Sequence, residues 1–237
     1  MPLAVEVEQL NFSYPDGTKV LEGLTFAIEE GSSVGLIGPN GAGKTTLLLH
    51  LNGILKGQGR IRIFGTEITQ DSLFEIRRQV GLVFQDPDSQ LFMPSVFDDV
   101  AFGPLNMGLD AQEVKRRVRG TLAAVDMQDS MERASHHLSF GEKKRVCVAT
   151  VLAMEPRLLV LDEPTSNLDP GHRQQLIQIL KDVPVTKLIA SHDLDMIQSL
   201  TEKVILLTHG QMAAYGPTKQ ILMDRESLKR HGFTFLS

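Results

Sequence analysis

The sequence predicts an α/β fold with a mostly parallel sheet, an antiparallel β region near the N-terminus and an inserted helical region. Short apolar runs alternate with helical segments from residue 32 to 85 and again from residue 156 to 216. Residues 3–28 show strand-like alternation around a turn, and residues 86–155 show helical periodicity without strand patterns. These three observations divide the chain into a sheet core, a β region and a helical insertion.

The antiparallel region opens the chain. Residues 3–9 alternate apolar and acidic side chains, and Gly17 supplies a turn before a second strand at residues 20–28. A further strand at residues 61–64 continues this sheet. We therefore assign residues 1–31 and 57–70 to the antiparallel β region.

A glycine-rich loop joins the first core strand, residues 33–37, to the helix at residues 45–51. It matches the pattern G-x-x-x-x-G-K-[ST] without a substitution. Its backbone N–H groups, the helix N-terminus and the charge of Lys44 would surround phosphate oxygens, and Thr45 would hold magnesium. The expected phosphate-binding residues are Gly38, Pro39, Asn40, Gly41, Ala42, Gly43, Lys44, Thr45 and Thr46. This loop predicts a nucleotide site.

The rest of the core is predicted from apolar runs separated by helical segments. Strands are expected at residues 80–84, 158–161, 187–190 and 204–207, and helices at residues 71–78 and 172–182. Such alternation indicates a parallel sheet, which we assign to residues 32–56, 71–85 and 156–216. The tail, residues 217–237, is expected to form one helix at residues 219–224 and a short solvated end.

The helical insertion covers residues 86–155. Asp110 and Glu113 resemble a capping box that begins the helix carrying Val114, Val118 and Leu122. A later helix is opened by Leu138-Ser139-Phe140-Gly141-Glu142.

Polar residues follow the buried strands of the core. Asp162 and Glu163 follow residues 158–161, where Asp162 would order a magnesium shell and Glu163 would polarise the attacking water. His192 follows residues 187–190 and could bond the γ-phosphate. The alternatives are a turn cap for the acidic pair and a structural role for the histidine.

Two further candidates are Gln85 and Tyr14. Gln85 ends a strand and begins the helical insertion, so a side chain there that touches magnesium or water could report the nucleotide state. Otherwise it is an ordinary polar strand end. Tyr14 could stack on the adenine ring, or it could be a partly buried core residue.

Composition narrows the function classes. The 237 residues are 42% hydrophobic, which is enough for a full core, and the formal net charge of −5 argues against DNA or RNA as a partner. The single Cys147 excludes an internal disulfide. No apolar run is long enough to cross a bilayer, so any membrane role would come through a partner.

Taken together, these motifs resemble the complete set found in ATP-binding-cassette ATPases. They lie in the family's order: residues 38–46, Gln85, residues 138–142, residues 161–163, residues 166–169 and His192. The resemblance implies a P-loop NTPase core of the RecA-like type that binds ATP and Mg²⁺. It makes Tyr14 the adenine-stacking residue, Gln85 the signalling glutamine, His192 the switch histidine and Asp169 the aspartate that faces a second protomer.

In that family two domains dimerise head to tail, and the signature helix of each covers the ATP bound by the other. Ser139 would donate its hydroxyl to the partner's γ-phosphate, and Gly141 would let the backbone approach it. Phe140 and Glu142 depart from the usual glycine and glutamine. We expect Lys143-Lys144-Arg145 to form a solvated helix face, with direct phosphate contact as the alternative.

Three segments are similar to the ATPase subunits of energy-coupling-factor importers, and most similar to those of the cobalt and nickel branch. These segments are residues 83–92, 102–109 and 138–145. The resemblance implies peripheral attachment to the cytoplasmic face of the membrane, where an identical or paralogous ATPase pair docks on a transmembrane coupling subunit. A second membrane subunit captures the substrate. The alternatives are a vitamin-type or other ABC transporter, a soluble cassette protein of translation or DNA repair, and a regulatory ATP-binding module without turnover.

Overall fold

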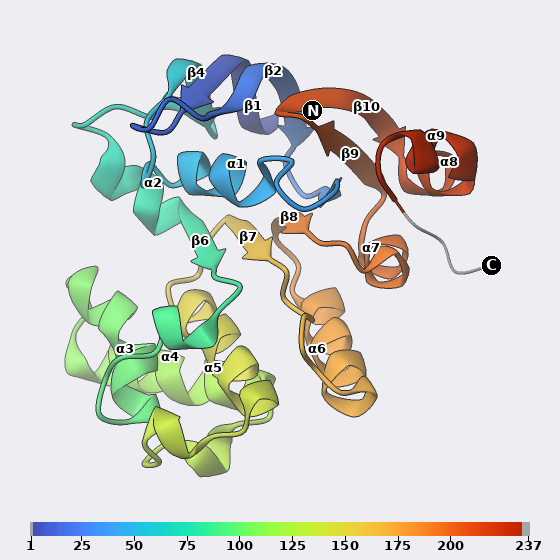
Figure 1. Ribbon diagram of the computed structural model, residues 1–237. Coiled ribbons are helices and arrows are strands. Elements are labelled where there is room, and N and C mark those ends of the chain that lie inside the picture. Colours follow the sequence, from blue (N-terminus) through green and yellow to red (C-terminus); the bar gives the residue numbers. More distant parts are fainter. Residues whose placement is uncertain (1, 234–237) are drawn as a thin grey trace.

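A computed structural model describes residues 2–233, and Figure 1 shows two sheets with a helical lobe below them. The smaller sheet is antiparallel and has the strand order β2-β1-β4-β5. Its alternating apolar side chains face inward, as expected for a sheet with one solvated face. The strands are β1 (Leu3–Ser13), β2 (Lys19–Glu29), β4 (Gln58–Ile63) and β5 (Thr66–Glu67).

The larger sheet has the order β10-β9-β3-β8-β7-β6. Neighbouring strands from β9 to β6 pair in parallel, and β10 pairs with β9 in the antiparallel sense. The strands are β3 (Ser33–Ile37), β6 (Val80–Val83), β7 (Leu158–Asp162), β8 (Thr186–Ala190), β9 (Lys203–Thr208) and β10 (Gln211–Pro217). The sheet is thus mostly parallel, with an edge strand, β10, that the sequence pattern did not predict. The parallel arrangement brings the ends of β3, β6, β7 and β8 to one edge of the sheet.

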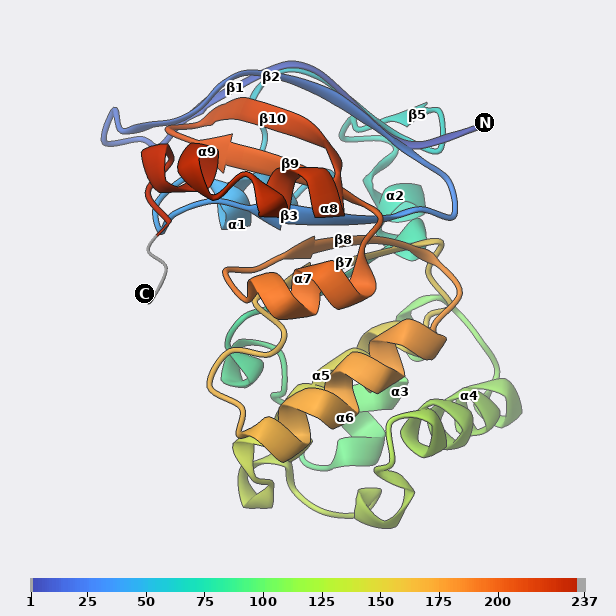
Figure 2. The same ribbon diagram turned by 90° about the vertical axis from the view of Figure 1, so that its right-hand side faces the viewer.

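Helices cover both faces of this sheet. Helix α1 (Lys44–Leu51) lies between the two sheets, where Leu47 and Leu51 pack in one cluster with Leu158 and Val160 of β7. The alternate residues of β7, Leu159 and Leu161, point to the opposite face and pack against α6 (Pro170–Asp182) and α7 (Leu194–Leu200). Helix α2 (Leu73–Gln79) leads into β6. Figure 2 shows α6 and α7 on the side of the sheet away from α1.

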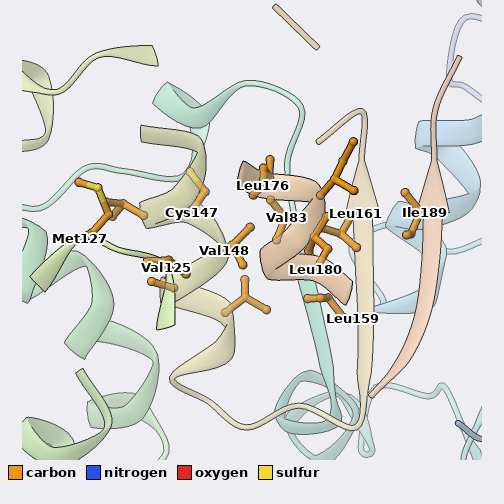
Figure 3. Close-up of a cluster of buried hydrophobic side chains, with 14 of the residues drawn as sticks. Val83, Val125, Met127, Cys147, Val148, Leu159, Leu161, Leu176, Leu180 and Ile189 are labelled. Carbon is orange, nitrogen blue, oxygen red and sulfur yellow. The ribbon is translucent and has the colours of Figure 1, made fainter. Parts of the chain in front are cut away.

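The helical lobe consists of α3 (Val96–Asn106), α4 (Ala111–Ala124), α5 (Phe140–Leu152) and three short 3₁₀ turns. Figure 3 shows how its core, including Val125, Cys147 and Val148, continues to Val83 and Leu161 of the sheet. The lobe is therefore joined to the sheet by a continuous apolar cluster. The 3₁₀ turns cover Pro87–Ser89, Gln128–Ser130 and Ser135–His137.

The start of α4 differs in part from the expected capping box. The Asp110 side chain accepts hydrogen bonds from the N–H groups of Gln112 and Glu113, at 2.9 and 3.0 Å. The Glu113 carboxylate instead pairs with Arg116 and Arg117. Only one half of the box is formed, because the two arginines compete for the glutamate.

The C-terminal region contains two helices rather than one helix and a solvated end. Helix α8 (Thr218–Met223) is followed by α9 (Arg225–Arg230), whose Leu228 is fully buried. Gly232, at a φ of +89°, ends α9, and the N–H of Phe233 returns to the carbonyl of Leu228 at 3.0 Å. The expectation for residues 234–237 lies outside the described residues.

No helix within residues 2–233 is long and apolar enough to cross a membrane.

Candidate nucleotide-binding and catalytic site

The glycine-rich loop leaves β3, all of whose residues are buried, and enters α1. A Cβ on Gly38 would lie 2.1 Å from the carbonyl oxygen of Leu207, so only glycine fits where the loop begins. Gly41 and Gly43 have positive φ angles of +77° and +101°, which a residue with a side chain rarely adopts. The loop can therefore direct consecutive N–H groups inward, which is the requirement for holding phosphate oxygens.

Lys44 crosses back over this loop. Its Nζ donates to the carbonyl oxygens of Gly38 and Pro39, at 2.8 and 3.1 Å. Burial lowers the pKa of Lys44, while the nearby carboxylates of Glu163 and Asp162 raise it. The ammonium is thus held at the mouth of the loop in a position to meet a phosphate.

Thr45 and Asp162 are joined across the loop. The Thr45 hydroxyl donates to Oδ2 of Asp162 at 2.7 Å. The other oxygen, Oδ1, is buried and has no partner among the described residues, and burial raises the pKa of this carboxyl. A buried carboxylate oxygen with a free lone pair beside a threonine hydroxyl is suited to a hard cation such as Mg²⁺.

Glu163 follows Asp162 with a φ of +45°, in the left-handed region. Its carboxylate accepts from the hydroxyl of Ser191 at 2.9 Å and from the N–H of His192 at 3.1 Å. The Nδ1 atom of His192 lies 2.8 Å from Oε2 of Glu163. The structure therefore brings the acid and the histidine together, although β7 and β8 are separated by an intervening helix in the sequence.

These residues line a single cavity of about 830 Å³. Tyr14, Gln85, Asp162, Glu163 and His192 contribute side chains or backbone to it, together with the whole glycine-rich loop. The Tyr14 hydroxyl lies 3.2 Å from Oγ1 of Thr46, and its side chain is 38% exposed. Tyr14 is thus a cavity residue with an accessible ring. The loop residues of the cavity are Gly38, Pro39, Asn40, Gly41, Ala42, Gly43, Lys44, Thr45 and Thr46.

Five further lining residues were not predicted: Asp16, Thr18, Val20, Gly232 and Phe233. The first three belong to the turn and strand after Tyr14, and their nearness to a predicted aromatic was the only sequence signal for them. The last two are more than 180 positions from the loop, and no sequence pattern points to them. The Schellman-type end of α9 brings Gly232 against Pro39, where an added Cβ would be in ordinary contact at 3.4 Å.

Three predicted site residues lie outside this cavity: Ser139, Gly141 and Asp169. Ser139 is exposed at the N-terminus of α5 and forms a full capping box with Glu142. The N–H of Ser139 donates to Oε2 of Glu142 at 2.7 Å, and the N–H of Glu142 donates to the Ser139 hydroxyl oxygen at 3.3 Å. Glutamate at this position therefore preserves the local hydrogen bonding, and the Ser139 hydroxyl hydrogen remains available as a donor.

Gly141 and Asp169 meet at His172. A Cβ on Gly141 would lie 2.6 Å from Cγ of His172, so the absence of a side chain makes room for the imidazole. The Nδ1 atom of His172 lies 2.5 Å from Oδ2 of Asp169, which also caps α6. The side chain of Asp169 is 61% exposed. These contacts form a surface in which the start of α5 is fixed to the start of α6.

The expectation of a solvated face at residues 143–145 is wrong for two of its three residues. Lys144 is fully buried and Arg145 is 8% exposed. Arg145 bonds the side chain of Gln175 on α6, and Lys144 donates to backbone carbonyls. Lys143 is partly buried, with 17% of its side chain exposed, and it pairs with Asp88 at 2.6 Å. The acceptors come from distant segments, so the charge pattern alone gave no sign of burial.

Comparison with known proteins agrees with this geometry. The family described as ABC transporter matches residues 21–166. A Geobacter sulfurreducens protein assigned as an ABC transporter ATP-binding protein is 54% identical, with 94% of this chain and 90% of the relative covered. The energy-coupling factor transporter ATP-binding protein EcfA of Carboxydothermus hydrogenoformans is 50% identical over 98% of this chain and 87% of its own.

A solved structure extends the comparison to three dimensions. CbiO1 from Clostridium perfringens, described as part of the ABC transporter complex CbiONQ, superposes with a TM-score of 0.85 at 38% identity. The match covers 97% of this chain and 94% of CbiO1. The chain therefore belongs to the ABC transporter family of ATP-binding proteins, in which ATP hydrolysis is coupled to transport.

Proposed function

We propose that this chain is the ATPase subunit of an energy-coupling-factor importer and acts as one half of a head-to-tail dimer. The observation that carries the proposal is the division of its predicted site. The glycine-rich loop, Asp162, Glu163 and His192 line one cavity. Ser139, Gly141 and Asp169 lie outside it at the starts of α5 and α6, where Ser139 and Asp169 are exposed and Gly141 is buried. A second protomer would bring that region to the open cavity.

ATP would be held first by the residues already in place. The loop N–H groups and Lys44 would bind the β- and γ-phosphates, and Tyr14 would stack on the adenine. Thr45 and Asp162, with Gln85, would hold Mg²⁺, which supplies positive charge to the phosphates when bound. The partnerless oxygen of Asp162 supports this assignment.

Glu163 would act as the general base for the attacking water. Its carboxylate is held by Ser191 and by the backbone of His192, so its orientation is fixed before ATP arrives. The His192 side chain is 65% exposed and could turn from Glu163 to the γ-phosphate. The N-terminus of α5 in the partner would add Ser139 and the positive end of a helix dipole.

The membrane partners would contact the helical lobe. Phe92 and Phe102 pack edge to face with ring centroids 5.1 Å apart, and they are 65% and 43% exposed. Leu105, which follows Phe102 on the same face of α3, is 56% exposed. We propose this patch as the docking surface for the transmembrane coupling subunit, with peripheral attachment at the cytoplasmic face. A separate membrane subunit would capture the cargo.

We further propose cobalt or nickel ion as the cargo. The likeness to CbiO1 supports this proposal, together with the segments after Gln85 and Phe102. This chain need not touch the ion, because transport would occur through the membrane subunits.

The test is reconstitution. The chain is purified from detergent extract together with the membrane proteins that accompany it, placed in liposomes and supplied with ATP and radioactive cobalt or nickel. ATP-dependent uptake of either ion supports the proposal, and uptake of a vitamin instead would overturn the cargo assignment. Recovery of ribosomes or DNA without membrane proteins would overturn the transport function itself.

A further inference from the structure

Lys144 joins the helical lobe to the catalytic edge of the sheet. It lies on α5, five residues after Ser139, and its side chain is fully buried. Its Nζ donates to the carbonyl oxygen of Gln85 at 2.7 Å and to that of Glu163 at 3.1 Å. One ammonium group thus links α5, the signature helix, to Gln85, the signalling glutamine, and to Glu163, the proposed base.

The buried ammonium group of Lys144 is expected to contribute little to the free energy of unfolding. Burial lowers the pKa of Lys144, because removing an ammonium group from water disfavours its charge, and the nearby carboxylates only oppose that shift. The ring of Phe140 lies 5.7 Å from Nζ, within the range of a cation–π contact. An apolar side chain of similar length would avoid the cost of burying a charge but would leave the carbonyl oxygens of Gln85 and Glu163 without this donor, so the two effects oppose each other.

The second acceptor has an unusual backbone. Glu163 is in the left-handed region, and its carbonyl also accepts the hydroxyl of Ser166 at 2.9 Å. Such a conformation persists only where surrounding contacts hold it. Lys144 connects this strained residue to the helical lobe by a hydrogen bond to its carbonyl oxygen.

We propose that Lys144 is a positioning residue that couples the signature helix to Gln85 and Glu163. It does not line the nucleotide cavity, so its effect reaches the reaction through these two residues and through the orientation of Ser139. When the lobe moves toward a partner, the backbone of Gln85 and Glu163 moves with it. This inference rests on the proposed head-to-tail dimer.

The first test replaces Lys144 by methionine; the matched control is the same substitution at Lys115, an exposed lysine on α4 of the helical lobe. Lys144→Met should lower turnover about tenfold or more, the effect of losing hydrogen bonds from a charged donor, with the dissociation constant for ATP unchanged. Its thermal midpoint should stay within about 4 °C of the wild-type value, because the avoided burial of a charge offsets the two lost hydrogen bonds. Lys115→Met should retain full turnover.

Loss of turnover with a matching loss of stability and ATP affinity would overturn the proposal, because a merely structural residue would behave in that way. Wild-type turnover by Lys144→Met would also overturn it. Lys144→Gln, which retains a donor, should recover part of the lost turnover; a Gln variant no better than Met would count against the hydrogen bonds as the cause.

The second test separates the effect of Lys144 on Glu163 in the same chain from its effect on Ser139, which would act in the partner's site. Mixing Ser139→Ala with Lys44→Ala protomers leaves one intact composite site, in which the first chain supplies the cavity and the second supplies the signature helix. Adding Lys144→Met to the first chain tests positioning of Glu163, and adding it to the second tests positioning of Ser139. We expect turnover to fall about tenfold in either arm relative to the unmodified mixture.

The unmodified mixture keeps the two proposals distinguishable. If that mixture shows no activity above its components, the head-to-tail dimer is refuted. If it is active and both Lys144→Met arms match it, the dimer stands and the positioning role of Lys144 is refuted.

Discussion

The nucleotide cavity is more complete within one chain than the signature surface, which is the region around Ser139, Asp169 and His172 at the starts of α5 and α6. In the cavity, Lys44 is bonded to its own loop, Thr45 to Asp162, and Glu163 to Ser191 and His192. At the signature surface, the polar groups of Ser139 and Asp169 are used to cap the helices that carry them. The polar groups of the cavity are therefore positioned around a space for a ligand, whereas those of the signature surface face solvent, where a second protomer could meet them.

This difference suits the cavity to nucleotide binding and the signature surface to a role in catalysis. A cavity whose donors are fixed in advance can bind nucleotide without a partner. A capped helix end that faces solvent contributes to catalysis only when a phosphate is brought to it. Variants in the cavity and at the surface should therefore affect different steps.

The largest effect is expected from Glu163→Gln, in the cavity. The amide keeps an acceptor for Ser191 and the His192 N–H, so the fold and ATP binding should be unchanged, while turnover falls about 10²- to 10⁴-fold. Phosphate release measures the turnover, and sedimentation should show a dimer trapped by ATP. Full-rate hydrolysis would refute Glu163 as the base.

A smaller effect is expected from Gly141→Ala, at the signature surface. The new Cβ would lie 2.6 Å from the His172 ring, which must move and release Asp169. We expect a loss of about 1–3 kcal/mol in the free energy of unfolding and lower turnover, with ATP binding by the monomer retained. Denaturant unfolding and nucleotide titration measure these separately.

Gly120→Ala is the matched control, because an added Cβ at this position of α4 meets no atom within 4 Å. It should raise the free energy of unfolding by about 0.5–1 kcal/mol. A Gly141→Ala protein as stable and active as this control would contradict the close contact with His172.

The smallest effect concerns pH and arises in helix α1, which follows the glycine-rich loop but whose His50 does not line the nucleotide cavity. His50 on α1 is buried, its Nδ1 lies 2.7 Å from the carbonyl of Thr46, and burial lowers its pKa. The unfolded chain therefore binds a proton that the folded chain does not. The free energy of unfolding should fall as pH drops below the ordinary histidine pKa of about 6.5, by at most about 1.4 kcal/mol per pH unit.

Denaturant unfolding at a series of pH values measures that slope. His50→Asn keeps a donor for Thr46 and should flatten the slope, whereas His136→Asn, at an exposed position near the signature surface, should leave it unchanged. An undiminished slope in His50→Asn would show that another group titrates.

The sequence predicted those features whose physical cause is local. The glycine pattern needs only a strand before it and a helix after it, and Asp162 and His192 lie at strand ends that a parallel sheet must place at one edge. The mostly parallel sheet and the antiparallel opening region follow from hydrophobic patterns in the same way. Each of these predictions depends on a pattern within about ten residues.

The sequence could not predict contacts between distant segments. Phe233 reaches the cavity because of how α9 ends and packs, and Lys144 is buried because the carbonyls of Gln85 and Glu163, which follow β6 and β7, lie beside α5. Strand β10 was missed because none of the residues Gln211–Pro217 is buried, so this edge strand carries no strong apolar pattern. In each case tertiary packing overrides the local signal.

The central claim is that one catalytic site needs two chains, and mixing inactive protomers tests it most directly. Ser139→Ala retains the cavity and loses the signature hydroxyl, whereas Lys44→Ala retains the signature helix and loses ATP binding. Phosphate release by the mixture should clearly exceed that of either variant alone, because one composite site per mixed dimer is intact. A mixture no more active than its components would contradict the claim.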